Sequence, residues 1–352
     1  MTANDERLAV GSGPSGPARL QEVLDELVAG GAPGALAELR DGTGTWRLTS
    51  GVAELGASRP VDPSGWFRIG SVTKTFTATV VLQLAGEGRL GLDDTVERWV
   101  PGSVPGAAEI TVRQLLNHTS GLYNYTRDLT TDGILRDRFR RWTPHEVVTW
   151  AGRHGPDFPP GTSRAYNNTA YVLLGMVIEQ VTGHPYGEQI ERRILRPLDL
   201  RHTRVCDDRE LLPEPHAHGY LAVDGRPVDI TVYNPSQAGA AGGMVSTAAD
   251  LNRFFAELLT GDLLPAAERR EMRATVAVET PGVSRYHLPG GVSVLGKDGG
   301  YHGYRTWSFH TADAARQLTV SMTVALTPGP TTQEFLARAA AAFSPARRRQ
   351  AS

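Results

Sequence analysis

Cysteine is almost absent from this sequence, since Cys206 is the only one in 352 residues. A single cysteine excludes an internal disulfide and a thiolate metal cluster, and we expect it to be inert. Long apolar runs are also missing, because no stretch approaches the roughly 18–20 apolar residues that span a bilayer. The net charge of −2 provides no basic surface for nucleic acid. We therefore expect neither a membrane nor nucleic acid as a partner.

The N-terminal segment lacks the basic stretch and following apolar run of a secretory signal. We therefore expect a cytoplasmic protein, unless a signal peptide has been removed. The histidines show no metal-ligand spacing such as H-E-x-x-H, so we expect neither metal nor cofactor. The hydrophobic fraction of 40% and the charged fraction of 21% are typical of a folded globular chain.

Lysine is the other scarce residue. Of 36 basic residues only Lys74 and Lys297 are lysines, and the rest are arginines. With the abundant glycine and alanine, this indicates a codon bias under which a surface lysine is readily replaced by arginine. A lysine that must share or lose a proton resists replacement, because a guanidinium stays protonated. The two retained lysines are therefore candidates for chemistry.

The hydrophobic pattern divides the chain into three parts. The first part is typical of mixed helix and strand, the middle part of helices, and the last part of strands followed by a closing helix. The expected N-caps are Thr143 and Ser246, and 207–240 is expected to be loop with one hairpin. The expected helices are 18–28, about 71–86, 111–116, 144–151, 169–181, 186–195, 248–259 and 334–343, and the expected strands are 35–40, 46–52, 292–295, 303–310 and 318–325.

This order predicts an α/β fold in which both chain ends build one domain around a helical insertion. We assign residues 1–80 and 241–352 to the α/β domain and 81–240 to the inserted all-helical domain. The functional site is expected in the cleft between them. Residues 1–17 and 344–352, which have low-complexity composition, are expected to be flexible.

Ser71 and Lys74 form an S-x-x-K motif at the start of a predicted helix. Residues three apart share a helix face, so the hydroxyl and the amine lie within hydrogen-bond reach. A helix N-terminus adds N–H groups and a positive field, which suits a serine nucleophile. The alternative is a capping serine with a solvated lysine, because the motif occurs by chance in many helices. The scarcity of lysine favours the catalytic interpretation.

Two further segments each allow a functional and a structural interpretation. Tyr166 and Asn168 face the same side of an extended segment, or they are a core tyrosine and a helix N-cap. Lys297-Asp298-Gly299-Gly300 lies on a predicted strand whose glycines let a ligand approach the backbone, or it is a simple turn.

The order Ser-x-x-Lys, Tyr-x-Asn, Lys-x-Gly resembles the serine β-lactamase and penicillin-binding protein superfamily. The resemblance points to the branch of class C β-lactamases and the related D-alanyl-D-alanine carboxypeptidases and esterases, and it spans about residues 18–343. It implies a β-lactamase-like antiparallel sheet flanked by helices, with an inserted all-helical domain. Further segments agree with that branch: 68–70 (RIG), 115–122 (LLNHTSGL), 158–162 (FPPGT), 197–200 (PLDL) and 242–247 (GGMVST).

The resemblance also implies roles for four catalytic residues. Ser71 becomes the nucleophile that forms an acyl-enzyme, and Tyr166 becomes the general base that returns the proton to the leaving group. A free tyrosine titrates near pH ~10, so it needs flanking cations to work at neutral pH. Lys74 and Lys297 are the expected cations, and Lys74 also assists the proton transfers.

The same resemblance implies a substrate site. Asn168 is expected to hydrogen-bond the acyl-side amide of the substrate and Lys74. The backbone N–H groups of Ser71 and Gly300 are expected to form the oxyanion hole, where each donor is worth about 3–4 kcal/mol. Asp298 and Gly299 complete the expected substrate-binding residues.

Two positions depart from the family pattern. Asn167 stands where serine is usual and is expected to face away from the site with little effect. Asp298 stands where the family has a threonine that helps to hold a free carboxylate of the substrate. Like charges about 4 Å apart cost on the order of 1–4 kcal/mol. Asp298 is therefore expected to disfavour carboxylate-terminated donors, unless it pairs with Arg305 or Arg285.

Three functions follow as hypotheses, and the leading one is a serine acyl-enzyme catalyst that cleaves an amide or ester. It would pass the acyl group to water or an amine, as a hydrolase or transacylase of small-molecule or peptide biosynthesis. The second is an exported DD-carboxypeptidase or β-lactamase. The third is an inactive binding module, which the retention of both lysines disfavours. His118 is expected to brace its loop rather than transfer protons. The donor, the acceptor and the oligomeric state stay open.

Overall fold

The computed structural model describes residues 16–206, 209, 211–273, 282–288, 291–327 and 329–343. The first helix, α1 (Gly16–Ala29), begins inside the segment that we expected to be flexible, so that expectation is wrong for residues 16 and 17. Residues 1–15 and 344–352 lie outside the described residues. None of the described helices combines the length and the apolar character that crossing a membrane demands.

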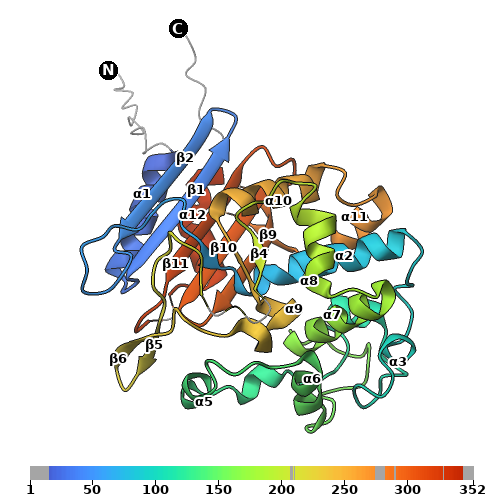
Figure 1. Cartoon of the computed structure of the whole chain (residues 1–352). Helices are drawn as coiled ribbons and strands as arrows, with labels where there is room; N and C mark the ends of the chain where they lie inside the picture. Colours follow the sequence, from blue (N-terminus) through green and yellow to red (C-terminus); the bar gives the residue numbers. More distant parts are fainter. Residues whose placement is uncertain are drawn as a thin grey trace, which may run out of the picture.

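An antiparallel sheet lies at the centre of the described structure (Figure 1). Its six described strands have the order β2-β1-β11-β10-β9-β8, so β1 near the start of the chain pairs directly with the last strand, and β2 pairs with β1. Both chain ends therefore build one sheet, which confirms the predicted α/β fold class. The strands are β1 (Gly34–Asp41), β2 (Gly44–Gly51), β8 (Ser284–His287), β9 (Ser293–Tyr301), β10 (Tyr304–Thr311) and β11 (Gln317–Thr323).

Helices cover both faces of this sheet. Successive side chains of a strand point to opposite faces, and β10 and β11 are buried at nearly every position, so both faces need packing partners. On one face lie α1 and α12 (Thr332–Phe343), and the Trp307 ring stacks on Phe335 with centroids 4.3 Å apart. On the other face lies α10 (Ala248–Thr260), against which the buried His310 packs. Helices on both faces therefore hold the strands that lie next to the predicted motif Lys297-Asp298-Gly299.

The central part of the chain is mostly helical and lies beside the sheet (Figure 1). Its two longest described helices, α2 (Thr73–Gly86) and α7 (Asn168–Thr182), are buried along most of their length, as their apolar composition predicts. Gly183 ends α7 in the left-handed conformation. The shorter helices there are α3 (Val96–Trp99), α4 (Val112–Leu116), η2 (Tyr125–Asp128), α5 (Thr131–Arg136), α6 (Pro144–Gly152), α8 (Tyr186–Ile190) and η3 (Glu191–Leu195).

Short elements connect the helical part to the sheet. The predicted hairpin within 207–240 is confirmed as β5 and β6, but two short helices, η4 and α9, were not expected there. Strand β9 runs from Ser293 to Tyr301, so the run predicted at 292–295 and the segment 297–300 belong to one strand. The bounds are β3 (Phe67–Arg68), η1 (Gly70–Val72), β4 (Arg204–Val205), β5 (Tyr220–Val223), β6 (Arg226–Asp229), η4 (Pro235–Gln237), α9 (Gly239–Gly242), β7 (Met244–Ser246) and α11 (Ala266–Arg273).

One of the two predicted N-caps is confirmed and the other is wrong. The Thr143 side chain accepts the backbone N–H of Glu146 at the start of α6, in a reciprocal capping box. Helix α10 is instead capped by Thr247, which accepts the N–H of Asp250. Ser246 is the last residue of β7, where strand pairing fixes its backbone and its hydroxyl bonds to Thr203.

The predicted domain boundary at residues 80 and 81 falls inside α2. One continuous hydrophobic core also joins β1 to α2 and α7, through side chains such as Leu36, Phe76 and Leu173. The division into two domains stays a prediction. The continuous core does have a consequence for function, because it fixes α2 relative to both the sheet and α7.

Candidate active site

Ser71 lies in the short 3-10 turn η1, directly before α2. Two side chains contact its hydroxyl: Lys74 Nζ donates to Ser71 Oγ over 3.1 Å, and the Tyr166 hydroxyl donates to it over 2.6 Å. Lys74 reaches Ser71 from the next turn of the chain, whereas Tyr166 comes from the segment before α7. The Ser71 hydroxyl is therefore held between an amine and a phenol, two groups that can take up and return its proton.

Lys74 is completely buried, so the alternative of a solvated lysine is wrong. Its Nζ also donates to Asn168 Oδ1 and to the Ala241 carbonyl, over 2.7 Å in each case. An ammonium has three N–H donors, and these three acceptors match them. Such partners make the burial of a charged amine tolerable and fix its position beside Ser71.

Lys297 of β9 and Lys74 of α2 both approach the Tyr166 ring. Their Nζ atoms lie 5.3 Å and 4.9 Å from the ring centroid. Lys297 is also buried, and among the described residues it has no carboxylate partner. The two positive charges stabilise negative charge on the Tyr166 oxygen, which helps this oxygen to accept the proton of Ser71.

Strand β9 passes directly beside η1, which brings two backbone N–H groups together. A Cβ atom on Gly299 would overlap the Ile69 carbonyl and lie 3.0 Å from Ser71 N. Gly70 has a φ of +50°, and a Cβ there would overlap the Gly300 carbonyl. Residues 297–300 belong to a strand, so their interpretation as a simple turn is wrong. Glycine at these positions allows the close approach that an oxyanion hole between Ser71 and Gly300 needs.

A pocket of about 420 Å³ adjoins Ser71, and Asn168 and Gly300 also line it. Tyr166 and Lys297 do not line this pocket, so it lies to another side of the nucleophile than the phenol and its cation. Burial, with Arg68 nearby, lowers the pKa of the pocket residue His302 to about 4, which leaves it uncharged. The remaining lining is mainly apolar and aromatic, but it also contains one cation and two polar side chains. It includes Tyr125, Leu129, Leu221, Tyr301 and Tyr304, with Arg305, Gln237 and Thr126.

Asp298 is partly exposed and does not line this pocket. Within the described part of the chain it forms no ion pair, either with Arg305 or with Arg285. The alternative of a neutralised Asp298 is therefore wrong for these two partners. Described strand β8 pairs with β9 only as far as Gly296, so Asp298 lies beyond that pairing on the edge of the sheet that leads to Ser71.

Asn167 and Asn168 have different tasks. Asn167 is the N-cap of α7, where it accepts the Ala170 N–H, so the idea that Asn168 is the cap is wrong. Asn167 is buried and also donates to the Leu122 carbonyl, so it faces away from the site as expected. Asn168 is the first residue of α7, and its side chain joins Lys74 to the pocket.

Asn124 is a functional residue that sequence reasoning missed. Its Oδ1 accepts from Asn168 Nδ2 over 3.3 Å, and its Nδ2 donates to the Tyr166 carbonyl over 3.3 Å. It therefore orients the Asn168 amide so that Asn168 Oδ1 faces Lys74. Asn124 lies 44 residues before Asn168 in sequence, and no local spacing connects them. The one signal in the sequence was its position two residues after the LLNHTSGL segment, which ends at Leu122.

Residues that could hold a metal ion do not converge in this structure. Among the described residues, no group of three or more histidine, cysteine, aspartate or glutamate side chains is arranged for this. The lone cysteine, Cys206, is buried in the core.

Comparison with known proteins assigns this chain to a family. The family model described as Beta-lactamase matches residues 20–343, so the chain belongs to the β-lactamase family. The fold is that of a β-lactamase-like serine hydrolase.

Three relatives illustrate the range of this family. The structure of a D-stereospecific amidohydrolase from Streptomyces sp. has a TM-score of 0.85 and 42% identity, over 91% of this chain and 97% of that chain. Penicillin-binding protein 4 of Amycolatopsis lactamdurans is 33% identical over 75% of this chain and 70% of that protein. Penicillin-binding protein 4* of Bacillus subtilis (strain 168) is 29% identical over 76% of this chain, and the match spans 63% of that protein.

Proposed function

We propose that this protein is a serine amidase and esterase that transfers the acyl group of a D-amino-acid derivative to water or to an amine. The observation that carries this proposal is the pair of contacts at Ser71, from Tyr166 at 2.6 Å and from Lys74 at 3.1 Å. Both contacts reach the one oxygen that would become the ester oxygen of the acyl-enzyme.

The proposed reaction has two halves. Ser71 Oγ attacks the substrate carbonyl while its proton passes to the Tyr166 oxygen, and the oxyanion is held by the N–H groups of Ser71 and Gly300. Tyr166 then gives this proton to the departing amine or alkoxide, which leaves an ester on Ser71. Water or an amine attacks this ester, gives a proton to Tyr166, and the proton returns to Ser71 as the acyl group leaves.

The pocket beside Ser71 is the proposed site of the acyl group. Tyr166 must reach the leaving group, and the pocket lies to another side of Ser71 than Tyr166. A volume of about 420 Å³ with an apolar and aromatic lining suits one amino-acid side chain of aromatic or aliphatic character. The preference for the D configuration is supported by the likeness to the D-stereospecific amidohydrolase, and transfer to an amine fits a role in peptide or small-molecule biosynthesis.

The test of this proposal is a comparison of enantiomers. We expect the purified protein to hydrolyse D-phenylalanine amide and methyl ester with a kcat/KM at least about tenfold above that of the L forms, a difference of ~1.4 kcal/mol. Adding hydroxylamine should divert part of the product to the hydroxamate without changing the rate of substrate loss if acylation is rate-limiting. Equal rates for the two enantiomers would contradict the proposed configuration, and no turnover of either would contradict the proposed pocket occupant.

Asp298 leads to a second prediction about substrates. Its carboxylate has no partner among the two candidate arginines, so it should repel a donor that ends in a free carboxylate. We expect slow wild-type hydrolysis of penicillin and of a peptide ending in D-Ala-D-Ala, and about a tenfold gain in Asp298→Thr, since ~1.4 kcal/mol of repulsion would be removed. The same variant should lose activity on D-phenylalanine amide. Efficient wild-type cleavage of the D-Ala-D-Ala peptide, unchanged by the substitution, would refute this role.

The same substrates separate the proposal from its main rival. A DD-carboxypeptidase or β-lactamase, which the penicillin-binding relatives favour, would prefer the carboxylate-terminated donors in the wild type. An inactive binding module would turn over none of them, and this rival is disfavoured by the complete set of contacts around Ser71.

A further inference from the structure

His118 lies behind the Tyr166 ring and has no task in the proposed reaction. Its imidazole ring is buried, with its centroid 4.7 Å from that of Tyr166 and 5.3 Å from that of Tyr171. Its backbone has a φ of +63°, a left-handed conformation that few residues other than glycine adopt. Surrounding structure must hold such a conformation in place, and such residues cluster at functional sites.

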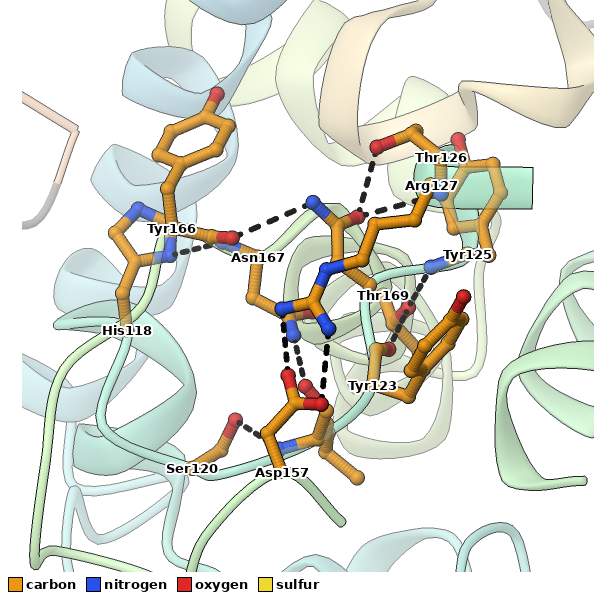
Figure 2. A network of polar contacts seen from close by, with 12 residues as sticks. His118, Ser120, Tyr123, Tyr125, Thr126, Arg127, Asp157, Tyr166, Asn167 and Thr169 are labelled. Carbon is orange, nitrogen blue, oxygen red and sulfur yellow. Dashed lines mark hydrogen bonds and ion pairs between the residues drawn. The ribbon is translucent and has the colours of Figure 1, made fainter. Parts of the chain in front are cut away.

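His118 holds the chain on both sides of Tyr166. Its carbonyl accepts the N–H of Ala165 over 3.1 Å, and its Nδ1 accepts the N–H of Asn167 over 3.2 Å (Figure 2). The Tyr166 carbonyl, at the other end of the same peptide group, accepts from Asn124. The Tyr166–Asn167 peptide is therefore fixed at both its N–H and its C=O.

The loop that contains His118 is itself fixed to the segment before Tyr166. The N–H groups of Asp157 and Gly161 donate to the Gly121 and Thr119 carbonyls, over 2.7 Å and 2.8 Å. The Arg164 Nε donates to the Asn117 carbonyl over 3.2 Å. These bonds make residues 117–121 a rigid support, so a displacement of the His118 side chain would be passed to Tyr166 rather than absorbed by the loop.

The surroundings of His118 also define its charge. Burial, followed by the positive charges of Lys297, Lys74 and Arg164, holds the pKa of His118 well below its usual value. The phenol of Tyr171 and that of Tyr166 are the other titratable groups that face the ring. An uncharged imidazole that accepts through Nδ1 carries its proton on Nε2. The neutral ring can therefore accept the Asn167 N–H, which a protonated imidazole could not.

We propose that His118 is a positioning residue for Tyr166, which holds the phenol oxygen against Ser71 by accepting the Asn167 N–H and by packing on the Tyr166 ring. The inference rests on the proposed function, in which Tyr166 exchanges the proton of Ser71. A misplacement of a reacting group by about 1 Å can cost on the order of 10²-fold in rate. His118 thus affects acylation without touching the substrate.

The test compares two variants that separate hydrogen bonding from packing. His118→Asn keeps an acceptor near the position of Nδ1 and suits a positive φ, but it loses the ring. His118→Phe keeps the ring volume but loses the acceptor. Each variant is treated with a fluorophosphonate. The maximal rate of inactivation and the reagent concentration that gives half of this rate are measured, and the labelled residue is identified. His310→Asn, which removes a different buried imidazole far from Ser71 in sequence, is the control for lost packing.

A positioning role predicts that His118→Asn keeps the inactivation rate within about tenfold of wild type, whereas His118→Phe loses about 10²-fold. The half-saturating concentration should change little in either, and His310→Asn should lose stability but keep its rate. A rate in His118→Phe equal to wild type, or above that of His118→Asn, would overturn the proposal. If His118→Phe does not fold, His118→Leu, which matches asparagine in size, replaces it with the same expectation. Absence of wild-type labelling at Ser71 would instead refute the proposed function.

Discussion

Ser71→Ala is expected to abolish turnover and covalent labelling while leaving the fold intact. The substitution removes the oxygen that accepts hydrogen bonds from both Tyr166 and Lys74, over 2.6 Å and 3.1 Å. Without this oxygen no acyl-enzyme forms, so we expect kcat/KM for a D-amino-acid ester to fall by at least about 10⁴-fold. The change is small and cavity-free, so the melting temperature should change by only a few degrees.

A matched control separates the loss of a nucleophile from the loss of a buried hydroxyl. Ser246→Ala removes a fully buried serine whose hydroxyl bonds to Thr203 and not to the site. This variant should lose about 1 kcal/mol of unfolding free energy and keep its kcat. If Ser71→Ala retained measurable turnover at the wild-type level, the assignment of the active site would be wrong.

Lys74→Arg is expected to lose at least about 10²-fold in kcat, the lower range for a lost proton-transfer partner. Arginine keeps the positive charge, but it cannot share or lose its proton, and its planar fork does not match the three acceptors around Nζ. These acceptors are Ser71 Oγ, Asn168 Oδ1 and the Ala241 carbonyl. The kcat is measured by single-turnover acylation, which isolates this step from product release.

The effect of Lys74→Arg on kcat can be compared with that of Lys297→Arg, which makes the same exchange at the other lysine. Lys297 Nζ lies 5.3 Å from the centroid of the Tyr166 ring, whereas Lys74 and Tyr166 are the side chains that donate to Ser71. The contribution of Lys297 is therefore electrostatic, and arginine should preserve much of it. We expect its loss in kcat to be smaller than that of Lys74→Arg. Should Lys74→Arg fail to fold in the buried site, Lys74→Met tests the same amine with an unbranched side chain. Wild-type rates in either Lys74 variant would show that proton exchange at this position is not needed.

Much of this site could be predicted from the sequence because its signals are local or chemically rare. The spacing of Ser71 and Lys74 predicted that the two side chains meet, although Ser71 lies in η1 and only Lys74 lies in α2, and the near absence of other lysines singled out Lys297. The alternating and 3.6-residue patterns also predicted the helices that cover the sheet and its described strands, except β8 (Ser284–His287). Each of these patterns lies within a single helix or strand, so it can be recognised without knowledge of the tertiary structure.

What the sequence did not predict depends on contacts between distant segments. Asn124 orients Asn168 across 44 residues, and nothing in the local spacing of either residue indicates this pairing. The run at 292–295 and the segment 297–300 were each predicted as strand, but only the pairing with β10 joins them into one strand that continues through two glycines to Tyr301. The N-cap of α10 is Thr247 and not the predicted Ser246, because strand β7 extends through Ser246.

The acyl-enzyme is the central claim, and intact-protein mass spectrometry after rapid acid quench tests it most directly. The protein is mixed with excess D-phenylalanine methyl ester, quenched during turnover, and digested to locate the added mass. The account predicts a mass increase equal to one phenylalanyl group on the peptide that contains Ser71, and no such increase in Ser71→Ala. Turnover with the added mass on another residue, or with an adduct that persists in Ser71→Ala, would contradict it.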